Sequence, residues 1–471
     1  MKFCAYLLFG AGLIGFGGAV DAAQANQDEL IAEIRALGGT AEVDPKLPGH
    51  PIVKIDLGNT RANDADLARL KSLKNVHWLS LWRTQVTDEG LAHLKDMTEL
   101  TWLDLGATRI TNDGLESLSG MRKLETLTLY NTRITDAGLT HLSTLNNLRE
   151  LAISDTPITG AGLDALAGHV KLRTLHLFRT RLTDTGLRHL EKLTSLETLD
   201  LGGTRITDAG LAHLKTLKSL ESLDLKHTGV TGEGLDELAG LTKLRTLDLG
   251  FTSLGQDGLE HVGVIKSLNR LYLSDTQVDD ESLKGLQGLK ELQELDLGLT
   301  PITNAGLANL KALSGLQELT LIGTQISDDG LAALSGLKYL RILVLTGDEI
   351  SDAGLAHLKP LTRMQHLDLR HTRITGAGLS HLKGMTQLES LDLGDTPLDN
   401  AGLDHLGELK SLLELNLYDT KIGDDGLKHL AGLTHVETLN LLGTQVSDAG
   451  MPAIGKLASL HVLSLLGTKV G

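Results

Sequence analysis

The sequence predicts an α/β solenoid with a parallel β-sheet on its concave face and short helices on its convex face. One residue pattern returns every 24 positions from Thr60 to Thr468, without an insertion or a deletion. In each repeat, two alternating leucine positions are followed by leucines at three-residue spacing. A fixed period of about 20–29 residues with leucines at constant offsets is typical of stacked structural repeats. The unbroken period therefore favours one solenoid over several globular domains.

The most regular position of the repeat is a threonine, which we call the ladder position. It is Thr in 17 of the 18 turns and Asp348 in the other one. The threonines are Thr60, Thr84, Thr108, Thr132, Thr156, Thr180, Thr204, Thr228, Thr252, Thr276, Thr300, Thr324, Thr372, Thr396, Thr420, Thr444 and Thr468. A hydroxyl at this position is expected to bond backbone groups of the adjacent turn. Asp348 can do the same, so its turn is expected to be intact.

The first half of each repeat is predicted to be a short strand. Leu103 and Leu105 precede the ladder residue Thr108 by five and three positions, with a polar residue between them. The other turns also carry Leu or Ile at both of these positions. Alternation of this kind places one face of a strand in a core and the other in solvent.

The second half of each repeat is predicted to be a short helix. In residues 134–145, leucines such as Leu139 and Leu142 lie three positions apart, as on one stripe of a helix. Thr135 is expected to cap the helix, Asp136 to favour the positive end of its dipole, and Gly138 to relax its first turn. Because each turn buries its leucines only against its neighbours, the stacked turns form one apolar column.

The motif LxxLxLxxT followed by ITDxGLxxLxxL resembles the leucine-rich repeat proteins. Threonine takes the place of the ladder asparagine usual in that family, and the turns are similar to the bacterial 24-residue type. The ITDAGL half also resembles the repeats attached to F-box proteins, although no F-box segment is found. The resemblance covers residues 51–471 and implies a right-handed solenoid curved like a horseshoe. It implies little about function, because this fold hosts many partners.

The N-terminal 25 residues are predicted to be a bacterial-type export signal. One lysine precedes about sixteen apolar or glycine residues, and residues 23–25 offer a small-residue cleavage site. An uncleaved membrane anchor is the alternative, although the stretch is short for a spanning helix of about 20 residues. No later segment is predicted to span a membrane. The mature protein is therefore expected to be exported, to the periplasm, the cell surface or the medium.

Residues 26–50 break the repeat and are predicted to form an N-terminal cap. Residues 26–39 show the pattern of a short amphipathic helix that ends in glycines, and residues 40–51 that of a strand and a turn. A segment of this kind covers the exposed leucines of the first turn. The solenoid itself is predicted to comprise residues 51–471, in 18 turns of which the last is incomplete.

Composition and motifs argue against several classes of function. The net charge of −16 is unsuited to nucleic acid, whose phosphates require a basic face. The single cysteine, Cys4, lies in the predicted signal, so the mature chain has no disulfides and no metal site built on cysteine. No sequence motif for catalysis, phosphate binding or a cofactor is found. We therefore expect a non-enzymatic protein without a cofactor or a metal.

Aromatic residues are the main candidates for a ligand-binding surface. Nine follow the N-terminal segment, and eight of these occupy strand positions that point away from the leucine core. Exposed aromatic clusters usually mark a binding surface. The candidates on the concave face are Trp78, Trp82, Trp102, Tyr130, Phe178, Tyr272 and Tyr418. The alternative is that these rings only shield the sheet or contact the N-terminal cap.

Aspartates four residues before the ladder position are the second group of candidates. Asp200, Asp224 and Asp248 occupy this position in three consecutive turns, so their carboxylates are expected about 5 Å apart. One interpretation is a solvated surface whose charge discourages aggregation. The other is attraction of a basic partner or of a divalent cation. The glycines two positions further on, such as Gly202 and Gly250, leave room beside the carboxylates.

The predicted function is recognition of another protein through the concave face, with the tryptophans as anchors and the aspartates as electrostatic steering. A carbohydrate-binding surface built on Trp78, Trp82 and Trp102 is the first alternative, and a structural spacer in a cell envelope is the second. The sequence stops three residues after the ladder residue Thr468, which leaves the last leucines uncovered. A tail-to-tail homodimer through this end is therefore a further expectation.

Overall fold

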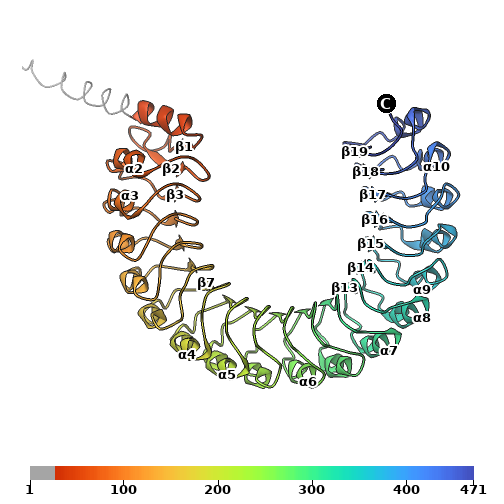
Figure 1. The fold of residues 1–471 in the computed structure, drawn as a ribbon, viewed down its shortest axis with the longest axis horizontal. Helices are drawn as coiled ribbons and strands as arrows, with labels where there is room; N and C mark the ends of the chain where they lie inside the picture. The colour runs from red at the N-terminus through yellow and green to blue at the C-terminus, as the bar shows by residue number, and fades with distance from the viewer. Residues whose placement is uncertain (1–26) are drawn as a thin grey trace, which may run out of the picture. The chain divides into compact units, whose positions relative to one another are not determined.

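The computed structural model describes residues 27–471, which fall into two compact units. Unit 1 ends at Leu196, and unit 2 runs from Glu197 to Gly471. In each unit the strands of successive turns lie on one side and the helices on the other (Figure 1). We call the side formed by the strands the sheet face. The predicted export signal, residues 1–25, lies outside the described residues.

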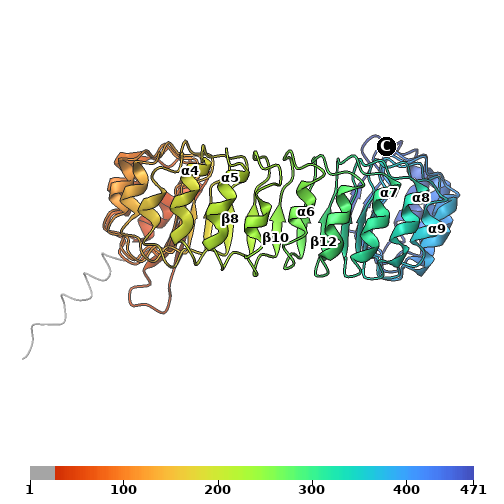
Figure 2. The ribbon, with the colours of Figure 1, turned by 90° about the horizontal axis from the view of Figure 1, so that it is seen from below.

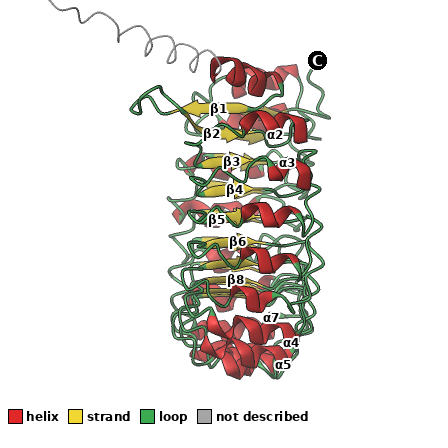
Figure 3. Ribbon diagram, turned by 90° about the vertical axis from the view of Figure 1, so that its left-hand side faces the viewer, coloured by secondary structure: helices red, strands yellow, loops and turns green. Residues whose placement is uncertain are grey.

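The strands of unit 1 form a sheet that is parallel except at its first strand. They are β1 (Thr40–Val43), β2 (Ile52–Asp56), β3 (Trp78–Ser80), β4 (Trp102–Asp104), β5 (Thr126–Thr128), β6 (Glu150–Ala152) and β7 (Thr174–His176). From β2 to β7, equivalent residues of consecutive turns pair, as Trp78 does with Trp102. β1 runs antiparallel to β2, and the loop after β1 extends beyond the sheet (Figure 3). The fixed repeat length therefore sets the register.

The strands of unit 2 are all parallel and pair in the same register. They are β8 (Thr198–Asp200), β9 (Ser222–Asp224), β10 (Thr246–Asp248), β11 (Arg270–Tyr272), β12 (Glu294–Asp296), β13 (Glu318–Thr320), β14 (Ile342–Val344), β15 (His366–Asp368), β16 (Ser390–Asp392), β17 (Glu414–Asn416), β18 (Thr438–Asn440) and β19 (Val462–Ser464). With the helices on the opposite side, this parallel sheet confirms the predicted fold class.

Each turn returns through a short helix of α or 3-10 type. Unit 1 has α2 (Asp64–Leu70), α3 (Asp88–Ala92), η1 (Gly114–Leu118), η2 (Gly138–Leu142), η3 (Leu163–Leu166), α4 (Asp184–Leu187) and η4 (Arg188–Lys192). Unit 2 has α5 (Asp208–Leu211), η5 (Ala212–Thr216), η6 (Leu235–Leu238), α6 (Gly258–Val262), η7 (Ser282–Gly288), α7 (Asn304–Leu307), η8 (Ala308–Ala312), α8 (Asp328–Leu331), η9 (Ala332–Gly336), α9 (Leu355–Leu358), η10 (Ala377–Gly384), η11 (Gly402–Glu408), α10 (Asp424–Leu430), η12 (Asp448–Gly450) and α11 (Met451–Ile454). Within unit 2, helices such as α7, α8 and α9 lie side by side (Figure 2). None of the helices in the described part of the chain is long and apolar enough to cross a membrane.

The core of each unit is the predicted column of leucines. In every turn before the last, the residues five and three positions before the ladder are almost completely buried, as Leu247 and Leu249 are. The leucine stripe of each helix packs against them from the opposite side, as Leu259 does. Because these side chains contact equivalent residues 24 positions away, each turn depends on its neighbours for its apolar burial.

The hydrogen bond of the ladder threonine differs from the prediction. Thr108 Oγ1 donates to the carbonyl oxygen of Leu105 in its own turn at 2.6 Å, and not to a neighbouring turn. The same bond recurs at other turns, as from Thr252 Oγ1 to the carbonyl oxygen of Leu249 at 2.6 Å. The threonine therefore closes the bend that follows each strand, where its hydroxyl satisfies a carbonyl that the sheet leaves free.

A different residue joins consecutive turns through its side chain. The carboxylate of Asp88, four positions after the ladder, accepts hydrogen bonds from Thr111 N at 2.8 Å and from Thr111 Oγ1 at 2.6 Å. Asp136 accepts from Thr159 N, Thr159 Oγ1 and two further backbone N–H groups of the next turn. The predicted role of Asp136 at its own helix dipole was therefore incomplete, because its carboxylate holds the next turn in place.

The glycine two positions after this aspartate position has a steric role. A Cβ atom at Gly114 would lie 2.2 Å from Asp88 Oδ1 of the preceding turn, and one at Gly138 would lie 2.5 Å from Asn112 Oδ1. The predicted role of Gly138 in its own helix turn was therefore incomplete, because the residue also makes room for the side chain of the preceding turn. Ser282 replaces this glycine in one turn. The turn before it carries Gln256 at the aspartate position.

The N-terminal residues form the predicted helix and strand. The helix spans residues 27–36, and its apolar side chains Leu30 and Ile34 are buried. A Cβ atom at Gly39 would lie 3.2 Å from Ile34 and 2.9 Å from Leu57, so the side chains of Ile34 and Leu57 leave no room for a larger residue at Gly39. The described cap segment thus packs against the leucine column of the first turn.

The last turn of unit 2 leaves apolar side chains exposed. Leu463 occupies the core position of β19 yet is 37% exposed, whereas its counterpart Leu439 in β18 is 1% exposed. Leu466 is 76% exposed. The homodimer through this end stays a prediction.

Candidate functional site

The aromatic residues that the sequence places on neighbouring strands do come together in unit 1. The rings of Trp78 in β3 and Trp102 in β4 stack with their centroids 4.2 Å apart and their planes 6° from parallel. Lys54 Nζ lies 5.0 Å from the centroid of the Trp78 ring. Because Lys54 and Trp102 pair with Trp78 from opposite sides, they cover both faces of its ring.

Trp82 and Tyr130 join this group across an intervening turn. The indole Nε1–H of Trp82 donates to the hydroxyl of Tyr130, which originates two turns further along the chain. Between them lies Gly106, and a Cβ atom there would be 2.4 Å from the Tyr130 ring. Gly106 therefore lets the tyrosine lie flat over its turn. All four rings are half-buried, and we call Trp78, Trp82, Trp102 and Tyr130 the aromatic cluster.

The other predicted aromatic residues lie outside this cluster. Phe178 in unit 1 is half-buried and follows β7, two turns beyond Tyr130. In unit 2, Tyr272 donates from its hydroxyl to Glu294 at 2.7 Å. Burial, reinforced by this bond to a carboxylate, raises the pKa of Tyr272 well above its ordinary value. Tyr418 lies over Gly394, with its hydroxyl 3.3 Å from His371 Nε2.

Unit 2 also exposes apolar residues at the ends of its strands. Phe251 stacks on His227 with the ring centroids 4.3 Å apart, and 44% of its surface is exposed. Leu299 is 54% exposed. Both residues adopt positive φ angles of 57°, a conformation in which bulky side chains are unusual. Other turns place Gly203 or Gly323 at this position, so the large side chains are not needed for the fold.

The predicted aspartates have a structural function in their own turns. Asp200, Asp224 and Asp248 each accept a hydrogen bond from the backbone N–H two residues later, at 2.9 to 3.0 Å. These bonds satisfy donors where the strands end. Burial raises the pKa of Asp248. The glycines beside them are thus partners in a turn, and the predicted room for a ligand is not their only explanation.

Basic side chains neutralise part of the aspartate row, by which we mean the aspartates four residues before the ladder position, including Asp368 and Asp392. Lys226 Nζ lies 2.8 Å from Asp224 Oδ2, and this bond, together with the nearby Asp248 and Asp200, raises the pKa of the lysine. Further along unit 2, Arg370 pairs with Asp368 at 2.6 Å and with Asp392 at 3.4 Å. No group of three residues within 27–471 is arranged to hold a metal ion. A role of the aspartates in steering a basic partner stays a prediction.

Sequence reasoning missed one buried histidine. His169 is completely buried at a core position of unit 1 where other turns carry Leu145 or Leu193. Its Nδ1 lies 3.2 Å from Leu166 O and its Nε2 lies 3.1 Å from Leu142 O. A neutral imidazole has one N–H, so it donates to only one of these carbonyl groups. Burial, which outweighs the two carbonyl contacts, lowers the pKa of His169.

We expect His169→Leu to stabilise unit 1 in acid. Leucine restores the apolar column that the neighbouring turns possess. Because the folded-state pKa of His169 is lowered, the unfolded chain takes up a proton first as the pH falls below 6.5, and the wild type loses stability there. Urea unfolding at pH 7.5 and pH 5.5 measures this. The gain in unfolding free energy should be larger at the lower pH, and a gain independent of pH would contradict the proton linkage.

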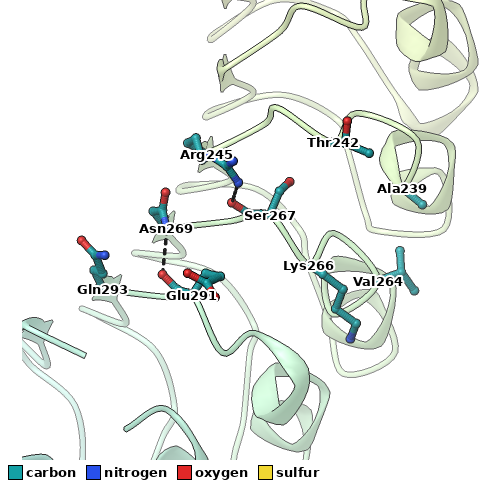
Figure 4. Close-up of a pocket in the computed structure, with 9 residues that line it drawn as sticks. All are labelled: Ala239, Thr242, Arg245, Val264, Lys266, Ser267, Asn269, Glu291 and Gln293. Carbon is teal, nitrogen blue, oxygen red and sulfur yellow. Dashed lines mark hydrogen bonds between the residues drawn. The ribbon is translucent and has the colours of Figure 1, made fainter. Parts of the chain in front are cut away.

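One cavity of unit 2 is lined by side chains that join adjacent turns. It has a volume of 640 Å³ and is lined by Ala239, Thr242, Arg245, Val264, Lys266, Ser267, Asn269, Glu291 and Gln293 (Figure 4). Arg245 donates to the carbonyl of Ser267 at 2.7 Å, and Asn269 donates to that of Glu291 at 2.8 Å. The polar side chains thus tie adjacent turns together. They do not form an arrangement of nucleophile, base and orienting group.

The comparisons with known proteins agree with this architecture. Residues 194–254 match a family model described as Leucine rich repeat, and residues 170–215 match one described as Leucine Rich repeats (2 copies). A further Leucine Rich repeat model matches residues 144–167, 362–382 and 408–431. No curated protein matches the sequence significantly.

Solved structures similar to this chain include bacterial and animal proteins. A leucine-rich repeat protein of Leptospira interrogans is 20% identical with a TM-score of 0.53, over 84% of this chain and 91% of that chain. The mouse RP105/MD-1 complex contains a chain that is 16% identical with a TM-score of 0.56, over 91% and 89%. An internalin of Listeria monocytogenes is 19% identical with a TM-score of 0.42, over 94% and 95%. The repeat geometry, the family models and the two structures with TM-scores above 0.5 show that both units have the α/β leucine-rich repeat fold.

Proposed function

We propose that this chain is a non-enzymatic binding protein that recognises another protein through the sheet face of unit 1. The observation that carries the proposal is the aromatic cluster. Leucines fill the core, so four large rings gathered on the opposite side of the strands contribute nothing to it. Half-buried aromatic side chains grouped at the centre of a surface are typical of the residues that dominate protein interfaces.

The contacts within the cluster favour a protein over a carbohydrate. Sugar rings stack on open faces of aromatic rings, but Lys54 and Trp102 cover both faces of Trp78. The indole N–H of Trp82 is already bonded to Tyr130. The cluster is a rigid aromatic surface. Because its side chains already hold one another in place, little side-chain freedom is lost on binding. Apolar and aromatic side chains of a protein partner suit such a surface.

We also propose that the protein acts outside the cytoplasm. The support is the apolar N-terminal segment with its small-residue cleavage site, residues 1–25. The mature chain keeps the net charge of −16, which favours solubility and repels nucleic acid.

The tryptophans provide a direct test, because the chain has only three. In the free protein, acrylamide should quench their fluorescence, because all three rings are only half-buried and the quencher can reach their exposed parts. Binding of a protein partner should reduce the quenching. The partner is sought by cross-linking to envelope and secreted extracts, followed by purification and titration against the free protein.

The matched variants are Trp78→Ala/Trp102→Ala and Tyr339→Ala, of which the second removes an exposed ring that does not belong to the cluster. Loss of the purified partner only in the double variant would support the proposal. Equal binding by wild type and double variant would refute it. Binding to a glycan array that depends on the tryptophans, with no protein captured, would establish the carbohydrate alternative instead.

A further inference from the structure

One edge of unit 1 carries a row of arginines in a protein that is acidic as a whole. Their side chains are exposed where the strands turn toward the helices. We call this set the arginine edge: Arg61, Arg83, Arg109, Arg133, Arg179 and Arg181. Residues 27–196 hold 20 basic and 22 acidic side chains, a net charge of −2, whereas residues 197–471 hold 23 and 37, a net charge of −14. The acidity of the chain is thus concentrated in unit 2, and unit 1 is free to present a basic surface.

The backbone fixes the position of these arginines. The N–H groups of Arg109, Arg133 and Arg181 donate to the carbonyls of Val86, Ile110 and Ile158 in the preceding turns, at 2.8 to 3.1 Å. Each of the three follows its ladder threonine directly, so equivalent arginines repeat along the edge at the spacing of the turns. The guanidinium groups are therefore presented from a rigid row and not from a mobile loop.

Most of this positive charge is uncompensated within the part of the chain that the structure describes. Arg179 Nε lies 3.3 Å from Asp155 Oδ1. The other five arginines have no acidic partner within ion-pair distance among residues 27–471. Arg109 and Arg133 lie in consecutive turns, where like charges repel. A row of unpaired like charges does not stabilise the fold, so it requires a different explanation.

The row includes a hollow in whose lining three arginines outnumber one aspartate. A cavity of 420 Å³ is lined by Thr132, Arg133, Asp155, Thr156, Pro157, Arg179 and Arg181. Pro157 occupies the position equivalent to Arg133 and Arg181 in the turn between them. Its short, uncharged side chain leaves the space between two guanidinium groups open. A guanidinium group binds a carboxylate through paired N–H donors in one plane.

We propose that the arginine edge binds an acidic segment of the protein partner, with one carboxylate in the hollow between Arg133 and Arg181. This inference rests on the proposed function, because the edge adjoins the strands that carry the aromatic cluster. Arg83 directly follows Trp82, and Arg133 lies three residues after Tyr130. Aromatic side chains at the centre of an interface with arginines beside them are the usual composition of such surfaces.

The proposal reverses the sign of the electrostatic steering expected from the sequence. The aspartate row of unit 2 is bonded to its own backbone and partly neutralised by Lys226 and Arg370. In the arginine edge, by contrast, only Arg179 has an ion pair with an opposite charge among residues 27–471. The edge therefore attracts acidic chains over longer distances, and salt weakens this attraction.

The test uses the mature chain and a fluorescent hexaglutamate peptide as the probe. The variant is Arg109→Glu/Arg133→Glu/Arg181→Glu. Its matched control is Lys95→Glu/Arg122→Glu/Lys192→Glu, which changes the net charge of unit 1 equally at exposed residues off the edge. We expect the wild type to bind the probe more weakly as salt is added. The edge variant should bind at least about tenfold more weakly, and the control within about twofold of wild type. Circular dichroism verifies folding, and Arg→Gln substitutions at the same three positions replace the variant if it fails to fold.

Several results would overturn the proposal. These are no binding of hexaglutamate, an equal loss in both triple variants, or tighter binding of oligogalacturonate or single-stranded DNA than of the peptide. Trp78→Ala/Trp102→Ala separates this proposal from the proposed function, because it should leave hexaglutamate binding unchanged. If binding of the partner requires the tryptophans but not the arginines, the proposed function stands and the proposal of an acidic segment is wrong.

Discussion

The Asp348→Thr variant is expected to be more stable than the wild type by about 4 kcal/mol above pH 7. Asp348 is the only non-threonine at the ladder position and is 2% exposed. Its Oδ1 accepts a bond from Thr324 Oγ1 at 2.9 Å, but its Oδ2 is buried without a partner, as is Thr346 Oγ1. Threonine would donate to the carbonyl of Leu345, as its counterparts do in other turns, and would remove a buried charge.

The gain should depend on pH because burial raises the pKa of Asp348 from 3.8 to about 7. Above pH 7 the carboxylate is ionised in both states, and the folded state bears the full cost of burying it. As the pH falls from 7 to about 4, the folded protein takes up a proton before the unfolded chain does, so the wild type becomes more stable. The shift of about three pKa units corresponds to the estimate of about 4 kcal/mol.

Chemical denaturation of unit 2 between pH 4 and pH 8 measures this difference. The stability of Asp348→Thr relative to the wild type should be largest at pH 8 and should shrink toward pH 4. Thr396→Asp, which places an acid at the ladder position two turns further on and again after a threonine, Thr372, is the matched control and should introduce a pH dependence of the same sign. A constant difference between Asp348→Thr and wild type across this range would show that the charge of Asp348 is not the cause.

Leu249→Ala should destabilise its part of unit 2 by about 2–5 kcal/mol. Leu249 is completely buried in the leucine column, so the change removes apolar contacts and leaves a cavity. Because each turn is stabilised by its neighbours, the loss should spread to adjacent turns and split the melting transition into two steps. Differential scanning calorimetry measures both the size and the shape of the transition.

Leu299→Ala is the matched control for this experiment. It removes the same atoms from a leucine that is 54% exposed, so the melting temperature should change little. Equal effects of the two substitutions, or an unshifted single transition for Leu249→Ala, would contradict the repeat register described for these strands.

Some features of the candidate site follow from the repeat alone. The register placed Trp78 beside Trp102, because residues 24 positions apart pair on neighbouring strands. The bond between Trp82 and Tyr130 did not follow, since it spans two turns and depends on the space above Gly106. The arginine edge went unrecognised because the net charge of the whole chain conceals the difference between residues 27–196 and 197–471.

The sequence by itself determined the strands, the helices, their register and the buried leucines. These are local or periodic properties, and a constant period transfers the geometry of one turn to the next. Only the tertiary structure decided which polar atoms meet. It showed that Thr108 bonds within its own turn, that Asp88 holds the following turn, and that Gly114 makes room for that aspartate. Such contacts depend on side-chain directions and on distances of a few ångströms between turns, which periodicity alone does not specify.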